Sequence, residues 1–117
     1  MYFEDSLRRT FERLADSAFA DVPGVKLIDS GRSGPTVGVI AGTHGNEPCG
    51  FTAHEALSNW KPPCGRLFLI VGNPAATAKY FAATSDAERT RCRCLDRNLN
   101  RMTLEFEAAE LNAYEVQ

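Results

Sequence analysis

A histidine and a glutamate separated by two residues could together bind a metal ion. They stand in the segment Gly42-Thr43-His44-Gly45-Asn46-Glu47. Imidazole nitrogens and carboxylate oxygens are good zinc ligands, and the short gap allows both to reach one ion from a tight turn. The same residues could instead be structural, with His44 and Asn46 capping a following helix and Glu47 favouring its positive end. From spacing alone, both alternatives remain open.

The other histidine, His54, is expected to take no part in such a site. If a helix begins near Glu47, His54 lies seven residues further on, which is about 10 Å along the helix axis. That separation prevents the two side chains from sharing one ion. We therefore expect His54 to lie on a helix face without a catalytic role.

The four cysteines do not indicate a metal site. Cys92 and Cys94 are separated by one residue, and Cys49 and Cys64 are isolated. Paired zinc-finger ligands usually have two to four residues between them. The N-terminus does not have the pattern of a secretion signal, so free thiols are favoured over disulfides.

A second polar segment, Arg93 to Arg101, could recognise a small anion. Its sequence, RCLDRNLNR, contains three arginines and two asparagines. Guanidinium groups bind carboxylates through two parallel hydrogen bonds, and asparagine adds a directional amide contact. The alternative is a solvated loop whose arginines pair with Asp86, Glu88 or Asp96. Composition alone favours this alternative, because exposed charges are the usual case.

Strands and helices alternate around these segments. The apolar run at residues 67–71 is typical of a strand buried on both faces in a parallel sheet. The stretch 84–97 is expected to be a loop with one short strand. Helices are predicted over residues 3–19, from about 48 to 60, over 75–81 and over 104–114, and the other strands over 25–29 and 36–41.

This alternation predicts an α/β fold with a mostly parallel or mixed sheet flanked by helices. Ligand sites in such sheets lie beyond the carboxyl ends of strands. The loops that follow Ala41 and Val71 both fall at such ends, so the fold is expected to place polar residues of both loops at one edge.

Size and composition are those of one soluble domain. The chain has 117 residues, is 44% hydrophobic and 24% charged, and has a formal net charge of -2. These values allow a core and do not indicate a nucleic-acid partner. No apolar stretch is long enough to span a membrane, and we expect a cytoplasmic protein.

Together these motifs resemble the succinylglutamate desuccinylase and aspartoacylase family, a branch of the zinc carboxypeptidase superfamily. Their order, their spacing and the strand pattern between them agree over about Val25 to Arg101. The combination is more specific than any one motif, and it favours the metal interpretation. The resembling residues are Gly42 to Glu47, Gly72-Asn73-Pro74-Ala75, Arg93, and Asn98-Leu99-Asn100-Arg101.

The resemblance implies a role for each matching residue. His44 and Glu47 would be two of three protein ligands of Zn²⁺. Arg93 would polarise the scissile carbonyl and stabilise the oxyanion, while Asn100 and Arg101 would hold the carboxylate of the substrate. The implied reaction is zinc-dependent hydrolysis of a small N-acyl amino acid to a carboxylate and a free amino acid.

The chain departs from the family pattern in three ways. The family's third ligand, a histidine, and its general base, a glutamate, come later, and no histidine follows His54. Asn98 stands where the family commonly has an aspartate that supports a zinc-bound histidine. We therefore expect residues 1–117 to be a single domain, the N-terminal part of the catalytic domain of a longer, truncated enzyme, and inactive alone.

Two other functions remain open on the sequence. One is a non-catalytic module that binds small acidic molecules, and the other is a truncated metallocarboxypeptidase that acts on peptides. The glutamates that follow the arginine-rich segment are interpreted as the solvated face of a helix; they are Glu105, Glu107, Glu110 and Glu115.

Overall fold

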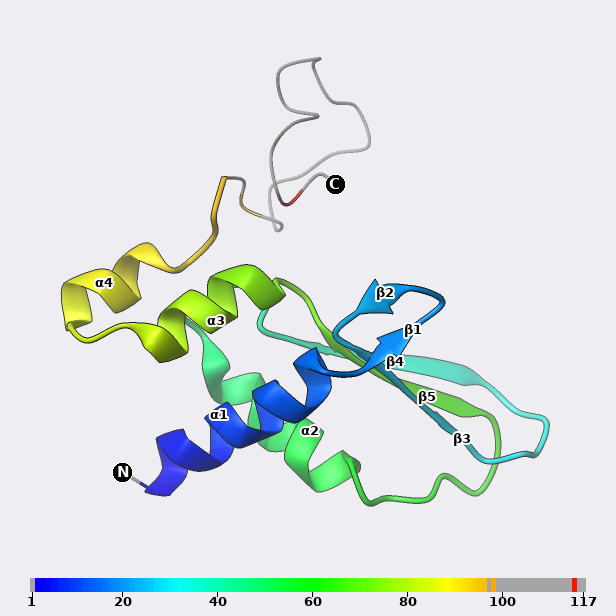
Figure 1. Ribbon diagram of the computed structural model, residues 1–117. Coiled ribbons are helices and arrows are strands. Elements are labelled where there is room, and N and C mark those ends of the chain that lie inside the picture. Colours follow the sequence, from blue (N-terminus) through cyan, green and yellow to red (C-terminus); the bar gives the residue numbers. More distant parts are fainter. Residues whose placement is uncertain (1, 97, 99–114, 116–117) are drawn as a thin grey trace, which may run out of the picture.

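Figure 1 shows the fold in a computed structural model, which describes residues 2–96, 98 and 115. The helices are α1 (Tyr2–Ala15), the 3-10 turn η1 (Pro48–Gly50), α2 (Phe51–Leu57), α3 (Pro74–Ala82) and α4 (Asp86–Arg91). The strands are β1 (Ala18–Phe19), β2 (Val22–Pro23), β3 (Val25–Asp29), β4 (Thr36–Ala41) and β5 (Arg66–Val71).

A three-stranded mixed sheet lies at the centre, in the order β3-β5-β4. Strand β4 is parallel to β5, with Ala41 opposite Val71 at their carboxyl ends. Strand β3 is antiparallel to β5. The predicted α/β class is therefore confirmed, with a mixed sheet flanked by helices. The register also confirms that the loops after β4 and β5 leave the same edge.

One face of the sheet carries the core. Leu67, Leu69 and Val71 of β5 are at most 4% exposed, and α1 and α2 cover them (Figure 1). Burial of each such side chain stabilises the fold by about 1.5–3 kcal/mol. The apolar stripe of α1 packs here because Leu7, Phe11 and Leu14 recur at helical spacing.

The prediction that β5 is buried on both faces is wrong for one of them. Its alternate residues, Phe68 and Ile70, are only partly buried. On their side, the β1–β2 hairpin places the Phe19 ring 5.0 Å from that of Phe68. The same face leaves Ile40 of β4 60% exposed, so within the described residues helices cover one face alone.

The first helix ends at Ala15 and not at residue 19 as predicted. Ala20 and Asp21 both have positive φ angles, which is the geometry of a tight hairpin turn. The apolar spacing continues to Phe19, which explains the overlong prediction. That side chain instead packs on the sheet through the hairpin.

The stretch 84–97 was predicted as a loop with a strand, and this is wrong for most of its described part. Residues 86–91 form α4. Ser85 caps this helix by accepting a hydrogen bond of 3.2 Å from the amide of Glu88. Serine followed three residues later by glutamate is a common helix start, so Ser85 and Glu88 account for the start of α4.

The remaining predicted helices divide into three outcomes. The helix predicted from 48 to 60 is present as η1 and α2 but ends at Leu57. The helix predicted over 75–81 is confirmed as α3, whereas the one predicted over 104–114 lies outside the described residues. In the part of the chain that the structure describes, no helix has the length and apolar character needed to cross a membrane.

Candidate functional site

His44 and Glu47 converge at the carboxyl end of β4. The chain leaves the strand through Gly42, whose φ of +67° favours glycine. Nδ1 of His44 then lies 3.0 Å from Oε2 of Glu47. His44 is buried, with 3% of its side chain exposed, whereas the Glu47 side chain is 53% exposed. The pair therefore stands at the boundary between the protein interior and solvent.

Helix capping does not account for this pair. Glu47 occupies the N-cap position of η1, yet its side chain accepts no hydrogen bond from the amides of that turn. Its two oxygens contact His44 and Arg93 instead. Glu47 therefore lies at the N-terminal end of η1, as the structural alternative has it, but its side chain makes no capping hydrogen bond there.

Asn98 completes the surroundings of the imidazole. Nε2 of His44 donates to Oδ1 of Asn98 over 2.8 Å. One ring nitrogen thus faces Glu47 while the other is held by an amide oxygen. Such a contact fixes the orientation of a ligating histidine and leaves its other nitrogen directed at the ion. Asn98 takes the position that the family resemblance implied for it.

Arg93 faces the same site. Its Nη1 donates to Oε1 of Glu47 over 2.9 Å. Of the acids considered as its partners, Asp86 pairs instead with Arg89 at 3.0 Å. Half-exposed, with 46% of its side chain accessible, Arg93 also remains open to a ligand from solvent.

The charge of Glu47 follows from these contacts. The contact with Nδ1 of His44 is the main cause that lowers the pKa of Glu47, and the hydrogen bond from Arg93 acts in the same direction. Partial burial opposes both effects. The carboxylate is therefore ionised at neutral pH, as a metal ligand must be.

Gly45 lets the histidine loop approach its neighbours. A Cβ atom at this position would lie 2.1 Å from the carbonyl oxygen of Cys92 and 2.4 Å from the carbonyl carbon of Ala76. The Gly45 amide also donates to the carbonyl of Arg93 over 2.9 Å. The backbone that carries His44 and the backbone that carries Arg93 are thus joined directly.

The second loop supports the first from the neighbouring strand. The Gly72 amide donates to the carbonyl of Ala41, and the Asn73 amide donates to that of Gly42, each over 2.8 Å. The Asn73 side chain also caps α3 by accepting from the amide of Ala76 over 3.2 Å. The Gly-Asn-Pro-Ala motif is therefore a structural base for the site.

The His44 and Glu47 pair fits a zinc ion as two of its ligands. Two atoms bound about 2.0–2.1 Å from one tetrahedral ion lie roughly 3.3 Å apart. Nδ1 of His44 and Oε2 of Glu47 are 3.0 Å apart, so only a small movement is needed. Among the described residues, no group of three His, Cys, Asp or Glu side chains could hold a metal.

The other residues considered as ligands lie elsewhere. His54 is fully buried in α2, where its Nε2 donates to the carbonyl of Val39 over 2.9 Å. His54 therefore makes its side-chain hydrogen bond within the core, to the neighbouring strand β4. All four cysteines are free thiols, as predicted.

The proposed substrate-binding residues, Asn100 and Arg101, lie outside the described residues, as does Arg97. Glu115 is described, and its interpretation as part of a solvated helix face is wrong. Its carboxylate accepts hydrogen bonds from the amides of Leu95 and Asp96. A contact to backbone amides has no sequence signature, so sequence reasoning could not find it.

Comparison with known proteins identifies one family. The model described as the succinylglutamate desuccinylase/aspartoacylase catalytic domain matches residues 33–116. This stretch begins just before β4 and contains His44, Glu47 and Arg93. Neither the comparison with curated proteins nor that with solved structures found a match.

Proposed function

We propose that this chain, which belongs to the succinylglutamate desuccinylase/aspartoacylase family, supplies part of the active site of a zinc-dependent enzyme that hydrolyses small N-acyl amino acids. The family is one of hydrolases. The observation that carries the proposal is the convergence of four side chains from separate segments, namely His44, Glu47, Arg93 and Asn98.

His44 and Glu47 would hold the zinc ion through Nδ1 and a carboxylate oxygen. Asn98 would keep the imidazole in place by accepting from Nε2. A zinc ion bound there supplies a Lewis acid and lowers the pKa of a bound water. The two ligands and the asparagine therefore serve to fix the position at which the water is activated.

Arg93 would act on the substrate. Its guanidinium lies beside Glu47 and is half exposed, so it can donate to the oxygen of a carbonyl that enters from solvent. Negative charge develops on this oxygen as the amide is attacked. A fixed positive charge is then worth more in the transition state than in the ground state, which accelerates the reaction.

A complete site needs residues beyond those described. Catalytic zinc usually has three protein ligands, and the described residues bring two together. We propose that the third ligand and a general base come from outside the described part. In this proposal residues 1–117 are the N-terminal part of the catalytic domain of a longer enzyme.

The substrate side of the proposal concerns Asn100 and Arg101. They follow Asn98 closely in the chain. Asn98 itself contacts His44. A guanidinium and an amide suit a carboxylate. We therefore propose that this pair holds the carboxylate of the N-acyl amino acid.

Zinc titration of the chain tests the metal site. Competition with a chromogenic chelator should give one bound zinc, and Glu47→Gln should weaken binding at least tenfold, because an anionic ligand is lost. Glu55→Gln is the matched control, since Glu55 lies on α2 and contacts Ser6 on α1. Equal zinc affinity in the two variants would contradict the proposed ligand.

A substrate-binding measurement tests the proposed roles of Asn100 and Arg101. The zinc-loaded chain should bind N-acyl derivatives of aspartate or glutamate, and Arg101→Ala should weaken this binding by about tenfold or more. Arg32→Ala, at an exposed turn, is the control. Undiminished affinity in the Arg101 variant would refute the role of that residue.

The same measurements separate the two alternative functions. A binding module would bind the acidic ligand equally well without zinc. The longer protein, which includes the third zinc ligand, would then not hydrolyse that ligand. A metallocarboxypeptidase would release C-terminal amino acids from peptides rather than acyl acids from N-acyl amino acids. Either result would replace the proposed activity.

A further inference from the structure

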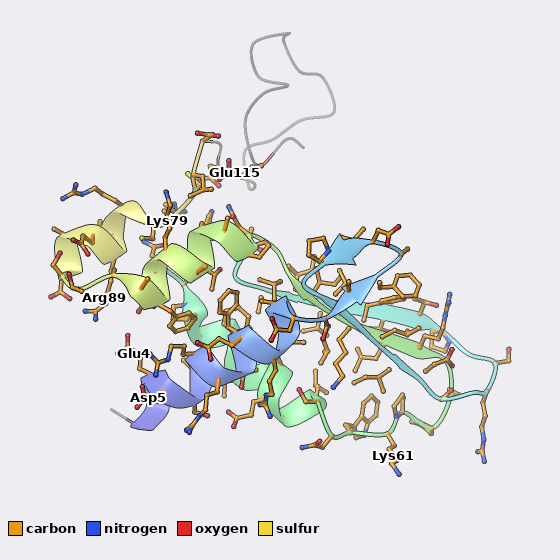
Figure 2. The ribbon with its side chains drawn as sticks, in the orientation of Figure 1. Glu4, Asp5, Lys61, Lys79, Arg89 and Glu115 are labelled. Carbon is orange, nitrogen blue, oxygen red and sulfur yellow. The ribbon has the colours of Figure 1, made fainter. Side chains whose placement is uncertain are left out.

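We propose that Glu115 is a positioning residue that holds the backbone at Leu95 and Asp96 in the place the site requires. Figure 2 shows Glu115 beside the segment that follows α4. The carboxylate accepts from the amide of Leu95 through Oε1 and from the amide of Asp96 through Oε2, the second over 2.9 Å. Both bonds join residues about 20 positions apart in the chain.

A third donor ties the same carboxylate to the base of the site. Nδ2 of Asn73 donates to Oε1 of Glu115 over 3.1 Å. Asn73 is 1% exposed, and its own amide is bonded to Gly42 in the histidine loop. Glu115 therefore connects the 95–96 backbone to the loop after β5.

The chemistry of this contact makes it a strong one. Hydrogen bonds to an ionised carboxylate are shorter and roughly twice as strong as those between neutral groups. Two consecutive amides donate to the two oxygens of one carboxylate, which fixes the direction of the backbone at Leu95 and Asp96 as well as its position. A glutamine in place of Glu115 keeps one acceptor oxygen and presents an amide group to donors.

The segment fixed in this way carries both residues that act on the ligand pair. Arg93 precedes Leu95 by two residues and bonds Glu47, and Asn98 follows Asp96 by two residues and bonds His44. Displacement of the 95–96 backbone would move both side chains. Glu115 thus acts on the site through Leu95 and Asp96. Among the described residues, it makes no hydrogen bond with His44 or Glu47, the two proposed zinc ligands.

The test compares the complete chain with its Glu115→Gln variant by NMR, in the absence of metal. We expect hydrogen exchange at the Leu95 and Asp96 amides to become about tenfold faster, and the imidazole ¹⁵N signals of His44 to shift as the Asn98 contact loosens. Exchange at Leu69, in the core, should not change. Glu55→Gln is the control, because it also removes a carboxylate that joins two segments distant in sequence.

Zinc affinity is measured on the same variants, and this part alone rests on the proposed function. Loss of an outer contact typically weakens metal binding by about 10–100-fold, and we expect a decrease in this range for Glu115→Gln. If the unsubstituted chain binds no zinc while the NMR changes occur, the proposed function fails and the positioning role stands.

Unchanged exchange at Leu95 and Asp96 would overturn the positioning role. Faster exchange with unaltered His44 signals would overturn it as well, because the hydrogen bonds of Glu115 would then have no effect on the His44 side chain. Should Glu115→Gln fail to fold, scalar couplings across the hydrogen bonds between these amides and the Glu115 carboxylate can be measured in the unsubstituted chain. Their absence would equally refute the contact.

Discussion

Nε2 of His44 donates to Oδ1 of Asn98 over 2.8 Å, although 54 residues separate the two. His44 follows β4, and Asn98 follows α4. The contact leaves Nδ1 of His44 directed at Glu47. The orientation of the proposed ligand is therefore set by a residue that is distant from it in the chain.

Asn98→Asp should strengthen zinc binding. A carboxylate that accepts from Nε2 raises the basicity of the imidazole more than a neutral amide does. We expect zinc affinity to rise by about tenfold, and Asn98→Ala to lower it by a similar factor. Chelator competition on the purified variants measures both, and weaker binding in the Asp variant would argue against Nδ1 ligation by His44.

Gly45→Ala should displace the histidine loop. The new Cβ would lie 2.1 Å from the Cys92 carbonyl oxygen, so the backbone must move. We expect a loss of about 1–3 kcal/mol in the free energy of unfolding, together with loss of zinc binding. Urea unfolding measures the first effect and chelator competition the second.

Gly38→Ala is the matched control for this substitution. A Cβ there meets only Ile70 Cδ1, at an ordinary contact distance of 3.6 Å. We expect its free energy of unfolding to remain within about 0.5 kcal/mol of the unsubstituted value. Similar losses in the two alanine variants would show that close approach at Gly45 is not the cause.

Arg93→Ala should separate activity from stability. The side chain is 46% exposed, so its ion pair contributes at most about 1 kcal/mol to folding. In the complete enzyme, kcat should fall by about 10²–10³-fold, the usual effect of removing an oxyanion donor. Arg89→Ala, which removes the pair with Asp86, should leave kcat unchanged, and parallel kinetics on both variants test this.

His54 should make the protein less stable as the pH falls below about 6.5. Burial lowers the pKa of His54, and its hydrogen bond to Val39 offsets this only in part. The unfolded chain then binds the proton more readily than the folded one. Its contribution to stability is complete above the ordinary histidine pKa and is lost below it, by at most about 1.4 kcal/mol for each pH unit.

Urea unfolding of the parent chain and His54→Gln at several values between pH 7.5 and 5 checks this effect. The difference in free energy of unfolding between the parent chain and His54→Gln should become smaller toward low pH. The lowered pKa values of Glu47 and Glu88 act in the same direction at lower pH, below the ordinary glutamate value. A pH-independent difference between the two proteins would mean that His54 is not held neutral in the core.

Much of the framework could be predicted from the sequence. Apolar runs at 36–41 and 67–71 specified β4 and β5 because β-branched and aromatic residues favour strands. The polar loops after them could be placed at one sheet edge on the assumption of parallel pairing, which β4 and β5 confirm. His44 and Glu47 could be named as a candidate pair because a two-residue gap lets both reach one ion from a tight turn, and the family resemblance favoured this interpretation over a structural role.

Tertiary structure decided what local patterns do not encode. The end of α1 is set by a hairpin whose Phe19 packs against Phe68, and apolar periodicity does not distinguish this from one more helical turn. The contacts of Asn98 with His44 and of Glu115 with Leu95 span 54 and 20 residues. Such contacts depend on the tertiary fold, which brings residues distant in sequence together. The spacing of residues along the chain does not predict them.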